Sequence, residues 1–310
     1  MKVFAILVVS VAVVVLGMHA AKVSAEEQPP AQAPVANGRP LLPVVPDSLS
    51  FCGERIPLER PEVRERLERE LIDNTHKTAQ TLLILKRAAR WEDILKGELR
   101  AAGVPEDLFY LAVAESELAN ATSRAGAQGF WQFMPSTAPE FGLRVGRELD
   151  ERDNPIAATH AAARYLTGAY ARTQSWPLAA AAYNMGLGRV LQNQRDQGAT
   201  GYFDLALNRE TQRYLYRILS FKCILSNPAA YGFDVPASAG YQPTPCRAIG
   251  VSQDVPDLVA FAQGQGHTYQ TLVLYNPWLK GTTLEVPTGK RYTLYLPDPN
   301  GTVPMGRVTE

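Results

Sequence analysis

The sequence has few of the residues that build metal sites and no excess charge of either sign. Its 310 residues include only three cysteines and four histidines. Cys52, Cys223 and Cys246 are too far apart in the sequence for zinc-ligand spacing, and their odd number leaves at least one unpaired within the chain. The formal net charge of zero argues against a nucleic-acid binder, which needs a basic stripe. We therefore expect no metal, no cofactor and no nucleic-acid partner.

One long hydrophobic run, Val3–Leu16, follows the basic start Met1-Lys2. The run is shorter than the roughly 20 residues that cross a bilayer, and the small-x-small pattern Val23-Ser24-Ala25 follows it. We expect a signal peptide over residues 1–25, and hence an exported, periplasmic protein with a mature net charge of about −2. The alternative is an uncleaved membrane anchor. No cysteine closely follows the run, so a lipid-modified start is not expected.

The composition changes along the chain divide it into further parts. Residues 26–50 are rich in proline and predict an extended linker. Residues 51–235 carry helical apolar spacing without the strict alternation of strands, which predicts an all-α domain. Residues 247–298 mix short helical runs with one alternating run and predict a small α/β unit, followed by a tail over 299–310. The fold class expected is therefore mainly α with a small α/β unit.

Several segments have a defined expected structure. The expected helical regions are Pro61–Leu118, Pro155–Thr173, Pro177–Tyr183, Glu210–Leu225, Val255–Gln263 and Thr268–Tyr275, and the expected strand is Arg291–Pro297. The alanine-rich runs in the second and third of these favour helix propensity and close packing.

Glu115 occupies a position where a helix of this kind normally carries a leucine. Leu108, Leu111, Glu115 and Leu118 recur at spacings of three and four, so they share one helix face. A carboxyl group in such an apolar stripe keeps its proton to higher pH, as a general acid requires. The alternative is a solvated or capping glutamate at a helix end, and the spacing alone does not separate the two. Glu117 points about 160° away on the same helix.

Four motifs in order then resemble one family. They are Glu115-Ser116, the run Ser123–Pro135 with Gly129-Phe130-Trp131-Gln132, Ala182-Tyr183-Asn184, and Glu210-Thr211-x-x-Tyr214. Together they resemble the lytic transglycosylases with a lysozyme-like domain of the goose-type/SLT kind, and most closely the membrane-bound lytic murein transglycosylase D type. The resemblance covers about residues 75–232. The sequence departs from the family pattern in two ways. It has Phe130 where the family more often has Leu or Ile, and its interval from Glu115 to Ser123 is shorter.

The resemblance implies a reaction and a set of site residues. It implies cleavage of the β-1,4 bond between N-acetylmuramic acid and N-acetylglucosamine in peptidoglycan without added water, with a 1,6-anhydro product and Glu115 as the catalytic acid and base. The substrate-binding residues that it implies are Ser116, Ser123, Gln132, Tyr183, Asn184 and Tyr214. Glycan strands are the expected partner, the protein is expected to be a monomer, and peripheral association with the membrane or wall is compatible with it.

Some of these residues also have a purely structural interpretation. Gly126 and Gly129 permit a tight turn beside the cleft or in a plain loop. Trp131 is expected in the core rather than as a sugar platform. Asn184 is compatible with a helix C-cap as well as with sugar binding. Tyr214 stands one turn into the last helix of the domain, and we expect its hydroxyl to reach Glu115.

Ordinary glycosidases need two carboxyls, and this sequence offers no obvious second one. Glu117 faces away from Glu115, and Glu210 starts a helix. Asp150 and Asp153 are expected to cap the helix that begins at Pro155. This pattern suits a non-hydrolytic reaction, in which the substrate supplies its own nucleophile.

The last unit resembles a divergent LysM module, a small glycan-binding fold. The matching positions include Val251, Leu272–Pro277 and Tyr295-Leu296-Pro297, and the usual glycine-aspartate start is missing. The alternative is a packing appendage on the catalytic domain. For the whole chain the alternatives are a goose-type lysozyme-like hydrolase, a catalytically inactive peptidoglycan-binding protein and, on the apolar start alone, a membrane-anchored structural protein.

Overall fold

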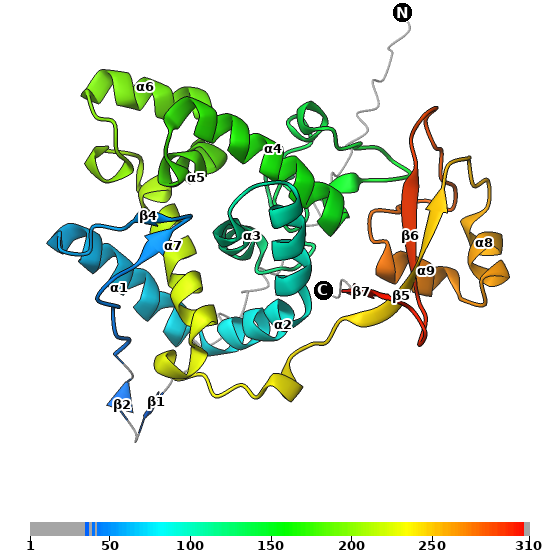
Figure 1. Cartoon of the computed structure of the whole chain (residues 1–310), viewed down its shortest axis with the longest axis horizontal. Coiled ribbons are helices and arrows are strands. Elements are labelled where there is room, and N and C mark those ends of the chain that lie inside the picture. Colours follow the sequence, from blue (N-terminus) through cyan, green and yellow to red (C-terminus); the bar gives the residue numbers. More distant parts are fainter. Residues whose placement is uncertain (1–34, 37–38, 41, 307–310) are drawn as a thin grey trace, which may run out of the picture. The chain divides into compact units, whose positions relative to one another are not determined.

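A short apolar helix, α3 (Phe109–Ser116), lies in the middle of the helical domain in the computed structural model (Figure 1). The structure describes residues 35–36, 39–40 and 42–306. The expected signal peptide, the first part of the expected linker and residues 307–310 lie outside them. None of the helices in the described part of the chain is long and apolar enough to cross a bilayer.

The other helices of this domain pack around α3 and against one another. They are α1 (Pro61–His76), α2 (Thr78–Ala101), α4 (Pro155–Thr173), α5 (Trp176–Met185), α6 (Leu187–Gln197) and α7 (Arg209–Ser226). The contacts α1–α7, α3–α7 and α4–α5 are the most extensive of the helix pairs. A single apolar core runs through them, so α3 contributes residues that are buried on nearly every side.

A capping residue explains where α4 begins, and small residues explain how closely α4 and α5 pack. The Oδ1 atom of Asn154 accepts hydrogen bonds from the amides of Ile156 and Ala157, and Pro155 occupies the first turn of α4. The alanines of α4 and α5 are buried, with Ala158 and Ala182 both fully excluded from solvent. The expectation of close backbone approach is thereby met. The expected capping of α4 by Asp150 and Asp153 was wrong, since Asn154, the residue directly before Pro155, performs it.

The expected helical region Pro61–Leu118 is interrupted and ends earlier than expected. It breaks at Lys77 between α1 and α2, and again around the turn that carries Pro105 before α3. At the far end, Glu117 and Leu118 have φ angles of 54° and 56°, in the left-handed region, and α3 stops at Ser116. Glu117 therefore lies beyond the helix rather than on its back face.

Two elements of this domain were not predicted from the sequence. Helix α6 has only one buried residue, Val190, and glycines at positions 186 and 188 precede or begin it. The hairpin of β3 (Ser50–Phe51) and β4 (Glu54–Arg55) is too short for an alternating pattern. Its turn has Cys52 and Gly53 at φ angles of 53° and 82°, the geometry that two-residue hairpins favour. Before the hairpin, Val45 packs into the core.

The C-terminal unit is a small antiparallel sheet covered by two short helices. Strand β5 (Thr244–Val251) pairs with β6 (Tyr292–Pro297) on one side and with β7 (Val303–Met305) on the other. Helices α8 (Leu258–Gly264) and α9 (Tyr269–Tyr275) begin after capping residues Asp257 and Thr268. The expected strand corresponds to β6. The segment 299–310, expected as a tail, includes β7, because Val303 and Met305 continue the ladder.

This unit is joined to the helical domain by specific contacts. The backbone amide of Asp150 donates to the carbonyl of Trp278 at 2.8 Å, and the amide of Lys280 donates to the carbonyl of Glu148 at 2.8 Å. The Lys280 ammonium pairs with Asp153 at 2.6 Å. Met305, at the end of β7, belongs to the same apolar core as the helices. The segment 148–153 is thus bound on one side to the C-terminal unit.

Candidate active site

Helix α3 holds Glu115 at the edge of the apolar core. Leu108 and Leu111 are completely buried, which confirms the apolar positions expected beside Glu115, whereas Leu118, also buried at 2% exposed, lies beyond the end of the helix. Glu115 itself is half-buried. Burial in this setting raises the pKa of the Glu115 carboxyl, because a low-polarity environment disfavours the charged form. The raised pKa is the property that a general acid needs near neutral pH.

Tyr214 of α7 contacts this carboxyl directly. Its hydroxyl donates a hydrogen bond to Oε1 of Glu115. This bond and the positive charge of Arg217 partly offset the effect of burial on the Glu115 pKa, whereas the negative charge of Glu210 adds to it. Tyr214 is 1% exposed, and burial together with the neighbouring carboxyl raises its pKa well above the usual value of 10.0. The phenol therefore remains a proton donor to Glu115.

The glycine-containing loop after α3 folds back on itself. The Ser123 hydroxyl oxygen accepts a hydrogen bond from the amide of Ala127 at 3.0 Å, so Ser123 stabilises its own loop. Gln128 and Phe133 exchange backbone hydrogen bonds of 3.1 and 3.2 Å. Gly129 has a φ of 80°, and a Cβ atom there would stand 1.9 Å from the carbonyl oxygen of Arg152. Only glycine fits where these two backbones meet.

Arg152 supports this loop from beneath. Its Nη1 atom donates to the carbonyls of Gly126 at 2.8 Å and Phe133 at 3.1 Å. Its Nη2 atom pairs with Asp150 at 2.7 Å, and both side chains are less than a tenth exposed. Sequence reasoning missed Arg152. The only signal in the sequence was the position of this arginine among the acidic residues 150–153, directly before α4.

Three of the expected site residues contact the backbone of the segment 129–132. The Ser116 hydroxyl donates to the carbonyl of Phe130 at 2.8 Å and so braces the end of α3. The Tyr183 hydroxyl donates to the carbonyl of Trp131 at 2.7 Å. The amide of Gln132 donates to the carbonyl of Gly129 at 2.9 Å. The structure therefore brings Ser116, Gln132 and Tyr183 together through this segment.

Trp131 lies in the core, as expected. Its side chain is fully buried, and its indole nitrogen donates to the Thr159 hydroxyl at 2.8 Å. Its ring meets Tyr183 edge-on with centroids 6.4 Å apart. Phe130 packs in the same way against Trp91 of α2 at 5.0 Å. The aromatic residues of the motif thus fix the loop to the helices and do not form a sugar platform.

Asn184 does not cap its helix. Gly186 is the residue that ends α5, with a φ of 92°. The Asn184 side-chain oxygen instead accepts a hydrogen bond from the Thr211 hydroxyl at 2.7 Å. Thr211 belongs to the first turn of α7, three residues before Tyr214, so Asn184 is tied to the helix that contacts Glu115. Thr211 was not among the expected site residues.

The other carboxyls considered earlier are each engaged elsewhere. Asp150 pairs with Arg152, and the Asp153 carboxylate, 2% exposed, pairs with Lys280 and accepts a hydrogen bond from Gln128. Glu117 accepts a hydrogen bond from Gln80. Glu210 is a lining residue of a neighbouring cavity and is not hydrogen-bonded to Glu115 by any contact within the described residues.

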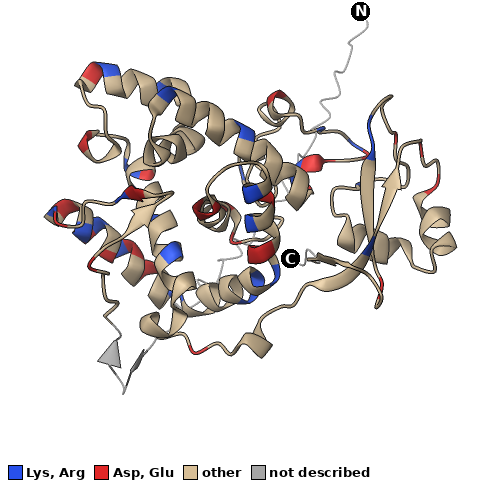
Figure 2. Ribbon diagram, viewed as in Figure 1, with Lys and Arg blue, Asp and Glu red and all other residues tan. Residues whose placement is uncertain are grey.

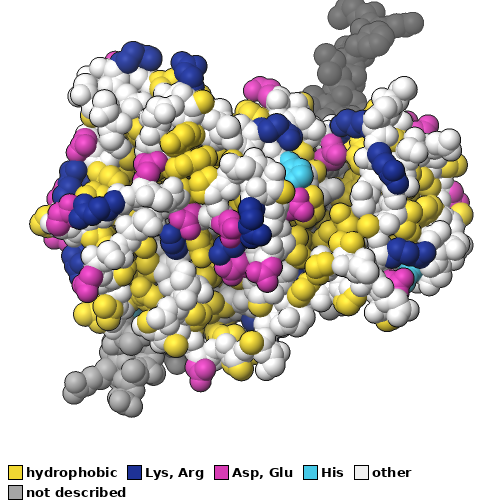
Figure 3. All heavy atoms as spheres, in the orientation of Figure 1, with side chains coloured by type: hydrophobic (Ala, Val, Ile, Leu, Met, Phe, Trp, Pro, Cys, Tyr) yellow, Lys and Arg dark blue, Asp and Glu magenta, His cyan; other side chains and the backbone are white. Residues whose placement is uncertain are grey.

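That cavity, of about 510 Å³, lies beside Glu115 between α1, the end of α3 and α7. We call it the charged cavity, because its lining includes Lys77, Glu117, Arg209, Glu210, Arg213 and Arg217. Tyr214 also lines it. Figure 2 shows acidic and basic residues along both α1 and α7, and Figure 3 shows charges of both signs intermingled on this face of the molecule.

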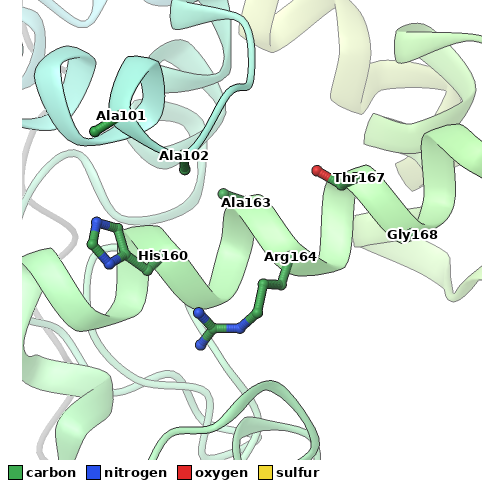
Figure 4. Close-up of a pocket in the computed structure, with 7 residues that line it drawn as sticks. All are labelled: Ala101, Ala102, His160, Ala163, Arg164, Thr167 and Gly168. Carbon is green, nitrogen blue, oxygen red and sulfur yellow. The ribbon is translucent and has the colours of Figure 1, made fainter.

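A second cavity, of about 670 Å³, is drawn in Figure 4, and no residue of α3 lines it. It is formed by the end of α2 and by α4, where His160 and Arg164 flank small residues such as Ala102, Ala163 and Gly168. His160 is bonded to Glu98 at 2.7 Å. With these small residues on its walls and none of the motif residues, it is not the candidate site. Within the described residues, no group of three His, Cys, Asp or Glu side chains could hold a metal ion.

Two known protein families match separate segments of this chain. Residues 93–205 match the transglycosylase SLT domain, a segment that includes Glu115 and the loop it contacts. The chain carries an SLT domain. Residues 247–300 match the soluble lytic transglycosylase C-terminal LysM-like domain. The resemblance inferred from the motifs is thereby confirmed, as is the mainly helical, lysozyme-like fold class with a small LysM-like unit.

Individual relatives agree with this assignment. The chain is 29% identical over 257 residues to membrane-bound lytic murein transglycosylase D of Escherichia coli K12, over 80% of this chain and 55% of that protein. It is 33% identical over 97 residues to a putative tributyltin chloride resistance protein of an Alteromonas species, over 31% of this chain and 47% of the relative. The chain thus spans about half the length of these curated relatives.

Among solved structures, an inactive mutant of the lytic transglycosylase Slt from Pseudomonas aeruginosa is similar to part of the chain. The two are 25% identical, with a TM-score of 0.37, over 47% of this chain and 26% of that one.

Proposed function

We propose that this protein is a peptidoglycan lytic transglycosylase with Glu115 as its catalytic acid and base. The observation that carries the proposal is a half-buried carboxyl with a raised pKa, hydrogen-bonded by Tyr214, inside an SLT domain. The named relatives that are lytic transglycosylases support the same activity. The substrate is the MurNAc-β-1,4-GlcNAc bond of the cell-wall glycan.

The reaction needs one protein carboxyl and no water. Glu115, protonated at the start, donates its proton to the glycosidic oxygen, and the bond from that oxygen to C1 of the muramic acid breaks. The C6 hydroxyl of the same sugar attacks C1, and its proton passes to the Glu115 carboxylate. The products are a GlcNAc end with a free hydroxyl and a 1,6-anhydroMurNAc end, and Glu115 is again protonated.

The neighbours of Glu115 are suited to this cycle. The Tyr214 hydroxyl stabilises the carboxylate that exists between the two proton transfers. Ser116, Gln132 and Tyr183 hold the segment 129–132 beside the acid, so that its backbone and the Gln132 side chain line the sugar site. We propose substrate contacts for Asn184 and Ser123 as well. The engagement of Asp150 and Asp153 in ion pairs supports a reaction without a second catalytic carboxylate.

We propose the following division of the whole chain. Residues 1–25 are a signal peptide, 26–50 a proline-rich linker, 51–235 the catalytic domain, 247–298 the LysM-like unit and 299–310 a terminal segment that contributes β7. The protein acts in the periplasm as a monomer, with peripheral attachment to the membrane or wall. The C-terminal unit binds glycan.

Digestion of purified peptidoglycan by the mature protein tests the activity. Mass spectrometry should find muropeptides lighter by one water than hydrolysis products, and Glu115→Gln should abolish their release. Reducing-end products would instead identify a goose-type lysozyme-like hydrolase. Binding of peptidoglycan without release of any product, by wild type and variant alike, would indicate a catalytically inactive binding protein.

A further inference from the structure

The charged cavity beside Glu115 contains a row of arginines on one helix face. Arg209, Arg213 and Arg217 follow one another at intervals of four along α7, and all three line the cavity. Arg213 is committed to the fold, because it forms two hydrogen bonds of 2.7 and 3.2 Å with Glu70, which is 1% exposed. Arg217 is different.

The Arg217 guanidinium lies against the ring of Tyr214, with its central carbon 5.6 Å from the ring centroid. Its Nε atom is buried and has no hydrogen-bond partner among the described residues. A buried guanidinium nitrogen without a partner is costly, and its planar fork of donors matches a carboxylate. The structure therefore has a cavity-lining donor that a carboxylate ligand would satisfy.

The position of Arg217 indicates which part of the substrate would supply that carboxylate. Tyr214 contacts both Glu115, through its hydroxyl, and Arg217, through its ring. The guanidinium is thus one aromatic ring away from the catalytic acid. The muramic acid whose C1 reacts at Glu115 carries a lactyl group on the neighbouring part of its ring, and in the intact wall that group bears a peptide.

The charge pattern of the cavity fits a peptide better than a sugar. The glycan backbone consists of hydroxyls and neutral acetamido groups, which require no ion pairs. The peptide stem carries carboxylates, and in diaminopimelate-type walls an ammonium group as well. Lys77 is already paired with Asp73 at 2.9 Å, but Arg209 and Arg217 line the cavity together with Glu117 and Glu210, so both kinds of charge have counterparts.

We propose that the charged cavity receives the peptide stem of the muramic acid held at Glu115, and that Arg217 binds a carboxylate of that stem. This inference rests on the proposed transglycosylase function and adds a substrate preference to it: strands that bear peptides are cleaved more efficiently than naked strands. Arg217 is thus a specificity-determining residue outside the motifs that mark the family.

The test compares two substrates. One is peptidoglycan with its stems, and the other is the same glycan after an amidase has removed the peptides, which leaves a free lactyl carboxylate. The measured quantity is the ratio of kcat/KM for the stem-bearing strand to kcat/KM for the naked strand. Wild type should show a ratio above one, and Arg217→Gln should lower that ratio by about tenfold, the loss expected for a charge-assisted hydrogen bond.

Two further variants serve as controls. Arg217→Lys, which keeps the charge but not the fork of donors, should give a ratio between those of wild type and Arg217→Gln. Arg172→Gln on the exposed side of α4 removes an equivalent charge away from the cavity and should leave the ratio unchanged. An equal loss on both substrates, which would reflect an electrostatic effect of Arg217 on Glu115, or a loss confined to naked strands, would overturn the inference.

A binding measurement separates this inference from the proposed activity. In the Glu115→Gln background, calorimetry with a disaccharide tetrapeptide and with the stem-free disaccharide should show tighter binding of the former, and Arg217→Gln should weaken it by about tenfold. If wild type cleaves neither substrate yet this binding difference persists, the proposed function fails and the stem site stands. Equal binding of the two ligands would refute the stem site.

Discussion

Tyr214 and Glu115 form a hydrogen bond although 99 positions separate them in the sequence. The pair joins the centre of the helical domain to the last helix that covers it. Because the phenol stabilises the ionised form of Glu115, it opposes the effect of burial on the pKa of that carboxyl. The balance between these two effects sets the pH range over which Glu115 holds a transferable proton.

Tyr214→Phe should lower kcat by about tenfold, since a hydrogen bond to a charged group is lost from the reaction cycle. The first step needs protonated Glu115, so activity declines as pH rises through its pKa. Loss of the phenol raises that pKa further, and the decline should move to higher pH. Tyr231→Phe removes a hydroxyl that is bonded to the Val44 carbonyl and to Cys223, with no contact to Glu115 among the described residues, and should change neither quantity. An unshifted pH profile in Tyr214→Phe would contradict the assigned role.

Glu115→Gln should make the protein more stable at neutral pH. The folded state raises the pKa of Glu115 above its usual value of 4.5, so the wild type loses stability as pH rises from about that value through the raised pKa. Glutamine carries no charge to desolvate and avoids this loss, which amounts to about 1.4 kcal/mol for each unit by which the pKa is raised. The two unfolding free energies should converge at acidic pH. Urea denaturation between pH 4 and pH 8 measures the difference, and a constant offset would rule out this explanation.

Gly129→Ala should destabilise the fold by about 3 kcal/mol or more. The added methyl group would collide with the backbone of Arg152, and the φ of 80° is unfavourable for alanine. Gly126→Ala is the matched control, since its φ is 86° but a Cβ there would meet no atom within 4 Å. It should cost only about 1 kcal/mol. Similar losses for the two variants, measured by chemical denaturation, would show that the close approach to Arg152 does not matter.

Lys280→Met should cost about 2 kcal/mol, because it leaves the buried Asp153 carboxylate without its partner. Burial already raises the pKa of Asp153, and the ammonium of Lys280 opposes that rise. The loss should therefore shrink at low pH, where Asp153 becomes protonated. Adding Asp153→Asn should recover part of the stability. Lys290→Met, at an exposed position of the same unit, is the control, and an equal effect there would argue against a specific ion pair.

Local patterns in the sequence predicted the elements that carry them. Leu108 and Leu111 marked the buried side of the chain beside Glu115, and Pro155 marked the start of α4. Helix α6 was not predicted, although Leu187, Val190 and Leu191 stand at helical spacing, because its apolar run is short and Val190 is the only side chain that it buries. The capping of α4 was misassigned, since acidic residues and asparagine are nearly equal as caps and only the folded turn distinguishes them.

The residues of the candidate site likewise fall into those that local sequence patterns predicted and those that they did not. Its motif residues were recognisable because four short motifs follow one another in the order and approximate spacing of the family that they resemble. Arg152, Thr211 and Arg217 were not, because their importance comes from contacts made across the fold, with Gly126, Asn184 and Tyr214 respectively. Nothing in the local sequence around Arg217 shows that one of its nitrogens is buried without a partner.

The contact between the end of β7 and α2 affects the order in which parts of the chain fold. A Cβ atom on Gly306 would lie 2.3 Å from the ring of Trp91, and that ring in turn packs on Phe130 in the loop next to Glu115. Contacts between positions so distant in the sequence form slowly, because a large loop must close first. The loop next to Glu115 thus receives part of its support only when the C-terminal sheet is in place. Folding intermediates that lack this sheet should accumulate before activity returns, and refolded protein should regain helicity faster than it regains turnover.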